Sequence, residues 1–166
     1  MAHRVNITKN IDRNDYSTPV MTEEDNMAAI GMLKDCVQRE PDPEWDEEEL
    51  EDNVLYVTGD LLIDVKNRKV YRCGVVTGMI EQEVSTAILL AQNCHTVCTR
   101  DALLDNYGSR YLYPEVISKH MYSIRQHLGQ CTLQEHKDRP YIVTMHKVGY
   151  KWNFPVLKIY RIPGKL

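Results

Sequence analysis

Basic and hydrogen-bonding side chains are concentrated in residues 114–129, which read PEVISKHMYSIRQHLG. One face of this segment is apolar at the spacing of an α-helix, through Ile117, Met121, Ile124 and Leu128. The other positions carry groups that could bind a ligand: Lys119, His120, Tyr122, Ser123, Arg125 and Gln126. Such a face suits nucleic acid, because cations attract phosphates and polar groups can bond base edges. An amphipathic helix packed on a small sheet would show the same pattern, so this segment alone leaves both interpretations open.

A second basic segment follows at residues 141–152, YIVTMHKVGYKW. It predicts a strand, a tight turn at 147–149 and a returning strand. The side chains of this hairpin that could meet a phosphate backbone or a minor groove are Thr144, His146, Lys147 and Tyr150. A cationic helix beside a basic hairpin indicates nucleic-acid binding more specifically than either segment alone.

The residues before the helix predict the elements that position it. Residues 54–78 alternate β-branched or aromatic runs with turn residues, which is typical of a meander of antiparallel strands. Asn67 is expected in a tight hairpin turn, because it tolerates a positive φ. Helical spacing recurs at 79–93, and Thr99 and Gly108 delimit another helix. Pro114 is expected in the first turn of the third. The predicted fold class is α+β: a winged helix-turn-helix with an N-terminal antiparallel sheet, three helices and a C-terminal β-hairpin wing.

Charge is divided unevenly along the chain, whose net charge is −4. Residues 1–53 contain 5 Lys and Arg against 15 Asp and Glu, a balance of −10, whereas residues 54–166 have a balance of +6. From Lys119 to the C-terminus the balance is +7. The composition therefore predicts an acidic N-terminal arm over 1–53, partly helical or disordered, joined to a basic domain over 54–166.

The arm itself has two recognisable parts. Residues 1–20 show no period and are expected to be loosely ordered, whereas Thr22 can cap a helix that extends to about Arg39, before Pro41 and Pro43. The acidic run 42–52, DPEWDEEELED, has three interpretations. It could be a solvated linker, a partner-binding surface around Trp45 and Leu50, or a mimic of DNA charge that shields the basic domain.

Four segments over about 54–152 resemble the winged-helix DNA-binding domain of OmpR/PhoB-type transcriptional regulators. Glu83 with residues 88–90 resembles the first helix of that family, and residues 99–104, TRDALL, resemble the second. Residues 117–128 resemble its recognition helix, with these in register: His120, Arg125 and Leu128. Residues 141–152 resemble its wing, with these in register: Thr144, Val148, Gly149 and Tyr150. Ser123 and Lys147 depart from the Arg and Gly that are common in the family, which affects the DNA sequence read and not the fold.

The resemblance implies a bacterial, cytoplasmic transcriptional regulator that reads duplex DNA sequence-specifically, with residues 114–129 in the major groove. The candidates for base contacts are then Lys119, Tyr122, Ser123 and Gln126. His120 and Arg125 would contact phosphates, and the hairpin would lie on the backbone or the adjacent minor groove. Two further partners are implied: RNA polymerase at residues 109–113, and a second copy of the chain on DNA. The layout resembles ToxR-like relatives, since the arm is too short for a phosphoacceptor receiver domain.

Other functions find less support in the sequence. Cys94, His95 and Cys98 invite a metal interpretation, but the resemblance places Cys98 in a partly buried strand or turn, where thiols are common, so no metal or cofactor is expected. No phosphate-binding glycine loop, nucleophile elbow or metalloprotease motif occurs, and enzyme activity is not expected. No segment reaches the roughly 18 apolar residues of a membrane span. The alternative function is a winged-helix protein-interaction module or co-regulator whose acidic arm binds a partner or masks the basic face.

Overall fold

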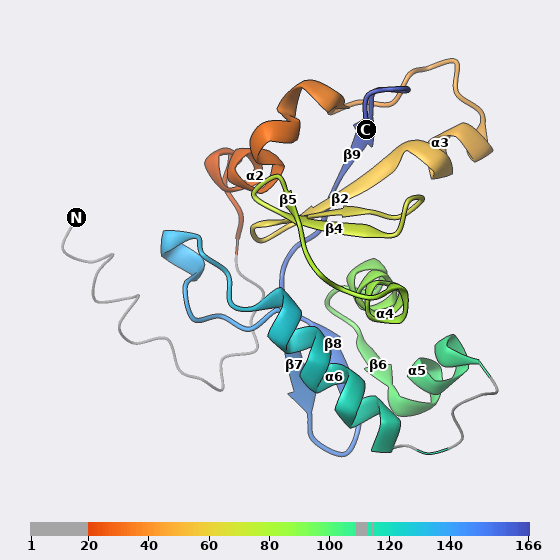
Figure 1. The fold of residues 1–166 in the computed structure, drawn as a ribbon, viewed down its shortest axis with the longest axis vertical. Coiled ribbons are helices and arrows are strands. Elements are labelled where there is room, and N and C mark those ends of the chain that lie inside the picture. The colour runs from red at the N-terminus through yellow and green to blue at the C-terminus, as the bar shows by residue number, and fades with distance from the viewer. Residues whose placement is uncertain (1–19, 109–112, 114) are drawn as a thin grey trace.

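The computed structural model describes residues 20–108, 113 and 115–166. Its larger sheet contains six strands: β1 (Val37–Gln38), β2 (Val54–Thr58), β3 (Leu61–Asp64), β4 (Lys69–Arg72), β5 (Val75–Val76) and β9 (Leu157–Arg161). Its smaller sheet contains three: β6 (Val97–Thr99), β7 (Ile142–Met145) and β8 (Gly149–Trp152). The two sheets lie toward opposite ends of the long axis, with the helices of the basic domain between and beside them (Figure 1).

Strands β2 to β5 form the predicted meander, each pairing antiparallel with the next. The turn between β3 and β4 is closed by Asp64, whose carboxylate accepts hydrogen bonds from the backbone N–H of Asn67 (3.1 Å) and from its side-chain amide (2.9 Å). Asn67 lies in this turn as predicted, although the residue with a positive φ is its neighbour Arg68 (54°). Asn67 stabilises the turn through its side chain instead, as an amide next to a carboxylate acceptor can.

Three helices follow the meander: α4 (Glu81–Gln92), α5 (Arg100–Tyr107) and α6 (Glu115–Leu128). The predicted limits of α5 are confirmed, since the Thr99 hydroxyl accepts from the Ala102 N–H (3.2 Å) and the helix ends at Gly108. The predicted apolar stripe of α6 is also confirmed, because all four of its residues are buried: Ile117, Met121, Ile124 and Leu128. Pro114 and residues 109–112 lie outside the described residues.

The C-terminal strand β9 was not predicted from the sequence. It enters the larger sheet between β1 and β2, so the strand order is β1-β9-β2-β3-β4-β5. A buried ion pair fixes its end: Arg161 Nη1 lies 2.6 Å from the Asp64 carboxylate, and both side chains are almost fully buried. Nη2 of Arg161 donates to the carbonyl oxygen of Asp52 (2.5 Å). One arginine thus joins the end of the chain to β3 and to the segment before β2.

The described part of the acidic arm is ordered against this sheet. Thr22 caps helix α2 (Glu23–Ile30), as predicted, and the structure adds a capping box with Asp25. The helix ends at Gly31 (φ 55°) rather than near Arg39. A 3₁₀ helix, η1 (Gly31–Cys36), then leads into β1, which pairs with β9. The acidic run contains helix α3 (Glu47–Asn53), capped by the Asp46 side chain. Residues 1–19, expected to be loosely ordered, lie outside the described residues.

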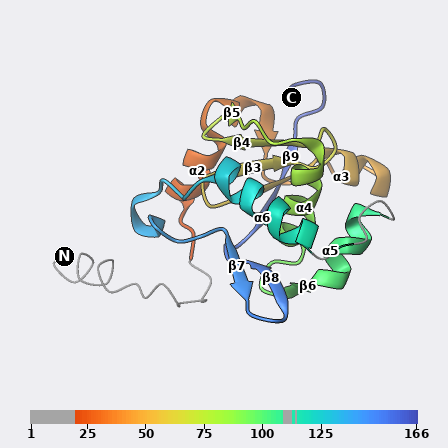
Figure 2. The same ribbon diagram turned by 60° about the horizontal axis from the view of Figure 1, so that its bottom comes forward.

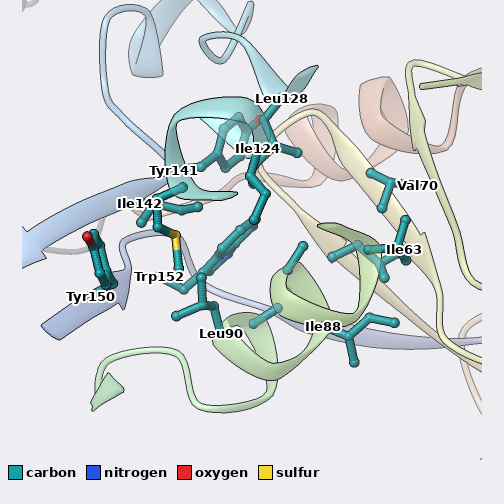
Figure 3. Close-up of a cluster of buried hydrophobic side chains, with 14 of the residues drawn as sticks. Ile63, Val70, Ile88, Leu90, Ile124, Leu128, Tyr141, Ile142, Tyr150 and Trp152 are labelled. Carbon is teal, nitrogen blue, oxygen red and sulfur yellow. The ribbon is translucent and has the colours of Figure 1, made fainter. Parts of the chain in front are cut away.

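Two apolar clusters follow from the two faces of the larger sheet. One face packs with α4, α6 and the smaller sheet, through side chains that include Ile63, Ile88, Ile124 and Trp152 (Figure 3). The other face packs with α2 through Ala29 and Ile30. The connector between α6 and β7 contains one short 3₁₀ helix, η2 (Gln134–His136). The core that positions α6 is therefore formed jointly by the sheet, α4 and the hairpin.

Replacing Arg161 with Met should lower the free energy of unfolding by about 3–5 kcal/mol, because the Asp64 carboxylate then remains buried without its cation. Urea unfolding followed by circular dichroism measures the loss. The matched control is Lys66→Met, which removes an ion pair with Asp52 (2.9 Å) between two exposed side chains. The control should cost no more than about 1 kcal/mol. Equal losses in the two variants would contradict the importance given to the buried pair.

Candidate nucleic-acid interface

The outer face of α6 carries an exposed row of polar side chains. Because the apolar stripe turns toward α4 and the hairpin, Lys119, Tyr122 and Gln126 point away from the core at the spacing of successive helix turns. Tyr122 is 69% exposed, at the middle of the helix. These three residues, predicted to contact bases, are therefore free of the core and share one surface.

The hairpin after α6 forms the predicted wing. Strands β7 and β8 pair antiparallel, and the turn between them is closed by the Val148 N–H donating to the Met145 carbonyl (2.9 Å). Lys147 lies in this turn with φ 64°, a left-handed conformation that glycine adopts more easily. His146, Lys147 and Thr144 are exposed. Gly149 is required for close packing, since a Cβ there would collide with the carbonyl oxygen of Cys98 on β6.

Arg125 joins α6 to the wing. Its Nη2 donates to the carbonyl oxygen of Ile142 (3.1 Å) and to the hydroxyl of Thr144 (2.8 Å), both on β7. Its guanidinium carbon lies 5.8 Å from the centre of the Tyr150 ring, within cation–π range. Burial lowers the pKa of Arg125 from its ordinary value, which leaves it charged at neutral pH. Arg125, which was predicted to bind phosphate, therefore contacts several groups of the domain itself, and these contacts hold the wing against the helix.

Three other residues predicted to bind DNA contact neighbouring elements instead of lying fully exposed. The Ser123 hydroxyl donates to Glu83 Oε1 on α4 (2.6 Å), and the ring of His120 packs on Tyr107 with centroids 5.0 Å apart. Tyr150 is only 4% exposed, under Arg125. Sequence periodicity did not separate these residues from the outer face, because their partners lie on helices and strands distant in the chain.

Glu83 is a site residue whose role the sequence did not show. Its carboxylate is almost fully buried on α4, and its other oxygen lies 2.7 Å from His127 Nδ1 on α6. The two α6 partners of Glu83, Ser123 and His127, are one helix turn apart, so they hold α6 in a single rotation about its axis. That rotation decides which side chains face outward.

A second buried carboxylate, Asp60, holds both ends of the interface. Thr132, just after α6, donates to Asp60 Oδ2 from its backbone N–H (3.0 Å) and its hydroxyl (2.7 Å). Tyr141, just before β7, donates its hydroxyl to Oδ1 and accepts from the Asp60 N–H (2.9 Å). Arg72 Nε lies 3.3 Å from Oδ2. Burial, and then the charge of Asp60, raise the pKa of Tyr141 far above its usual value, so the hydroxyl remains a donor.

The described acidic segment does not cover this surface. Helix α3 lies at the end of the long axis opposite the wing, and the two remain far apart after rotation of the view (Figures 1 and 2). Helix α3 and the wing therefore occupy separate parts of the described structure. Masking of the basic face by residues 20–53 of the same molecule is not observed in this arrangement.

Two further features of the described residues bear on function. Within 20–108, 113 and 115–166, no group of three His, Cys, Asp or Glu side chains is placed to hold a metal ion. In the same ranges, no helix is both long and apolar enough to cross a membrane. Cys98 lies buried in β6, where it faces Tyr150 across the β6–β8 pair.

An N-terminal sheet, three helices and a hairpin directly after the third helix define a winged helix-turn-helix domain. Comparison with solved structures specifies its type. The chain is 30% identical to the response regulator DrrB, an OmpR/PhoB homologue from Thermotoga maritima, with a TM-score of 0.50 over 60% of this chain and 44% of DrrB. It is 25% identical to the DNA-binding domain of Escherichia coli CadC, with a TM-score of 0.53 over 61% of this chain and 94% of that domain.

A third structure, the DNA-binding domain of E. coli CpxR, shares the fold at 21% identity and a TM-score of 0.51, over 61% of this chain and 96% of that domain. The chain spans less than half the length of DrrB. No protein-family model and no curated protein sequence matches it. The winged helix-turn-helix of this chain is thus similar to domains of OmpR/PhoB-type proteins, in agreement with the resemblance noted in its sequence.

Replacing Tyr141 with Phe should lower the free energy of unfolding by about 1–3 kcal/mol, because a buried carboxylate oxygen and the Asp60 N–H both lose their partner. Urea unfolding followed by circular dichroism measures the change. Tyr122→Phe is the matched control, since that hydroxyl is exposed on α6, and it should change stability by less than about 0.5 kcal/mol. If the Tyr141→Phe variant is as stable as the control, the hydrogen bonds between Tyr141 and Asp60 do not stabilise this interface.

Proposed function

We propose that this protein is a sequence-specific transcriptional regulator that binds double-stranded DNA, with α6 in the major groove and the β7–β8 wing on the backbone or the adjacent minor groove. The observation that carries the proposal is the exposed row of Lys119, Tyr122 and Gln126 on α6, beside a wing whose turn presents Lys147. A B-DNA major groove, about 12 Å wide, accommodates an α-helix. The similarity to DrrB and to the DNA-binding domain of CadC supports the same conclusion.

The proposed contacts divide into two kinds. Gln126 has the amide geometry that pairs with adenine, Lys119 can donate to guanine, and Tyr122 offers a ring face and a hydroxyl between them. Lys147, His146 and Thr144 on the wing meet phosphates, which position the protein without specifying sequence. Arg125, His120, Ser123 and Tyr150 act mainly by holding α6 and the wing in place, because each already contacts a neighbouring element.

Two further partners belong to the same proposal. The first is a second copy of the chain: the family resemblance implies that two copies bind adjacent half-sites on the DNA. Contact with RNA polymerase was predicted at residues 109–113, of which only Tyr113 is described, and it is 69% exposed. The proposal also places the protein in the bacterial cytoplasm, bound to the chromosome.

The double variant Lys119→Ala and Lys147→Ala should weaken binding to a duplex about tenfold or more and reduce the dependence of affinity on salt. Loss of the Lys147 phosphate contact lowers the slope of log K against log salt by about 0.9. Loss of Lys119 removes a base contact and weakens binding further. Electrophoretic mobility shift at several salt concentrations measures both effects.

The matched control is Lys69→Ala with Lys158→Ala, which removes the same charge from exposed positions on the larger sheet. It should retain the affinity of the unmodified protein within about twofold, since charges beyond a Debye length of about 8–10 Å are largely screened. An unchanged affinity in the Lys119 and Lys147 variant, or an equal loss in the control, would exclude the proposed interface.

Gln126→Ala should relax discrimination at one base pair by about 1–3 kcal/mol while leaving non-specific binding almost unchanged. Selection of binding sites from a random duplex pool, repeated with the variant, measures the preference at each position. Gln92→Ala is the matched control, because it removes the same side-chain amide from an exposed position at the end of α4. Identical selected sequences for the Gln126 variant and the unmodified protein would remove this residue from base recognition.

A further inference from the structure

The first turn of α6 carries a carboxylate that the proposed DNA contacts do not use. Glu115 is the first residue of the helix, and its side chain is exposed. Among the residues that the structure describes, no cation pairs with this carboxylate. A carboxylate on a surface that approaches phosphates is unfavourable, unless it binds a group that donates a hydrogen bond to it.

Glu115 belongs to the exposed row of α6. It precedes Lys119, Tyr122 and Gln126, and the successive spacings are four, three and four residues. At about 100° per residue, these four side chains lie within a sector of about 60° around the helix axis. The buried apolar stripe lies on the opposite side of the helix. The row that is proposed to face the DNA bases therefore begins at Glu115, one turn before Lys119.

Packing holds the N-terminal half of α6 in one position. Ile117, two residues after Glu115, is fully buried in the core. The ring of His120 packs on Tyr107 of α5, with centroids 5.0 Å apart. Before the helix, the Val116 N–H donates to the carbonyl oxygen of Tyr113 (3.1 Å) and closes the turn that leads into it. The backbone that carries Glu115 is therefore held on both sides, as recognition of a base requires.

The chemistry of a carboxylate selects among the four bases. An ionised carboxylate accepts hydrogen bonds and donates none. In the major groove, guanine presents two acceptors, and thymine presents an acceptor beside a methyl group. Adenine presents a donor beside an acceptor, whereas cytosine presents a donor alone, its 4-amino group. Cytosine is therefore the base that matches the Glu115 side chain best.

We propose that Glu115 recognises cytosine at one end of the DNA site, by accepting a hydrogen bond from the 4-amino group. The inference rests on the proposed binding of α6 in the major groove, and it names one base pair that this surface prefers. Glu115 precedes Gln126 by 11 positions, which is about 16 Å along the helix at 1.5 Å per residue. The cytosine therefore lies at the other end of the site from the base pair that Gln126 contacts.

The test replaces Glu115 with Gln, which preserves the size of the side chain and exchanges one acceptor for a donor. Because a glutamine amide pairs with N6 and N7 of adenine, the preference at this base pair should change from cytosine to adenine. Selection from a random duplex pool locates the position. Fluorescence anisotropy with four duplexes that differ only there should show each preference as about tenfold or more. A preference for cytosine that persists in the variant, or that is missing in the unmodified protein, would overturn the proposal.

The matched control is Glu81→Gln, because Glu81 is also exposed in the first turn of a helix, α4. Both changes remove a carboxylate from a helix N-terminus, where the helix dipole favours it, so the thermal unfolding midpoints should change alike. The Glu81 variant should retain the cytosine preference and bind the selected site within about twofold of the unmodified protein. Loss of the preference in both variants would overturn the proposal, since the effect would then come from net charge or stability.

The selection experiment also separates this inference from the proposed function. If the unmodified protein selects no sequence, sequence-specific DNA binding fails, and recognition of cytosine fails with it. If the unmodified protein and the Glu115→Gln variant select the same site, DNA binding stands and only the role of Glu115 is overturned. The Glu115→Gln and Gln126→Ala variants should alter different base pairs, because their side chains lie at opposite ends of the row. An effect of both variants on the same base pair would contradict the proposed placement of Glu115.

Discussion

The buried carboxylate of Asp60 is the interaction on which the geometry of this domain depends. A carboxylate removed from water is highly unfavourable unless hydrogen bonds and a cation satisfy it. Asp60 is fully buried. Its partners are Arg72 on β4, Thr132 in the connector after α6, and Tyr141 just before β7. Satisfying this one group therefore requires the sheet, the end of α6 and the beginning of the wing to assume a single relative arrangement.

The same principle explains why polar residues of α6 divide into two groups. Ser123 and Arg125 already bond groups of the domain itself, so they fix the orientation of the helix and the wing. Lys119, Tyr122 and Gln126 lie outside these contacts and remain exposed. A recognition surface needs both groups, because exposed side chains can read a ligand only when the backbone that carries them is held rigidly.

Net charge is a poor guide to the partners of this chain. Its overall value of −4 conceals an excess of carboxylates over residues 1–53, which include α3, and an excess of cations over residues 54–166, which include α6 and the wing. Screening at physiological salt limits the field of each charged surface to about a Debye length. The affinity for a charged ligand therefore depends on the surface that the ligand meets and not on the net charge of the chain.

The sequence by itself determined the winged-helix order of elements, the apolar stripe of α6 and the cap of α5, because these depend on periodicity and on residues close together in the chain. Only the tertiary structure decided the roles of Asp60, Glu83 and Arg161, the place of β9 between β1 and β2, and the ordering of the acidic run as α3. It also decided that Ser123 and Tyr150 face neighbouring elements. Each of these depends on partners tens of residues away, and local pattern contains no information about which distant group will satisfy a buried charge or cover a side chain.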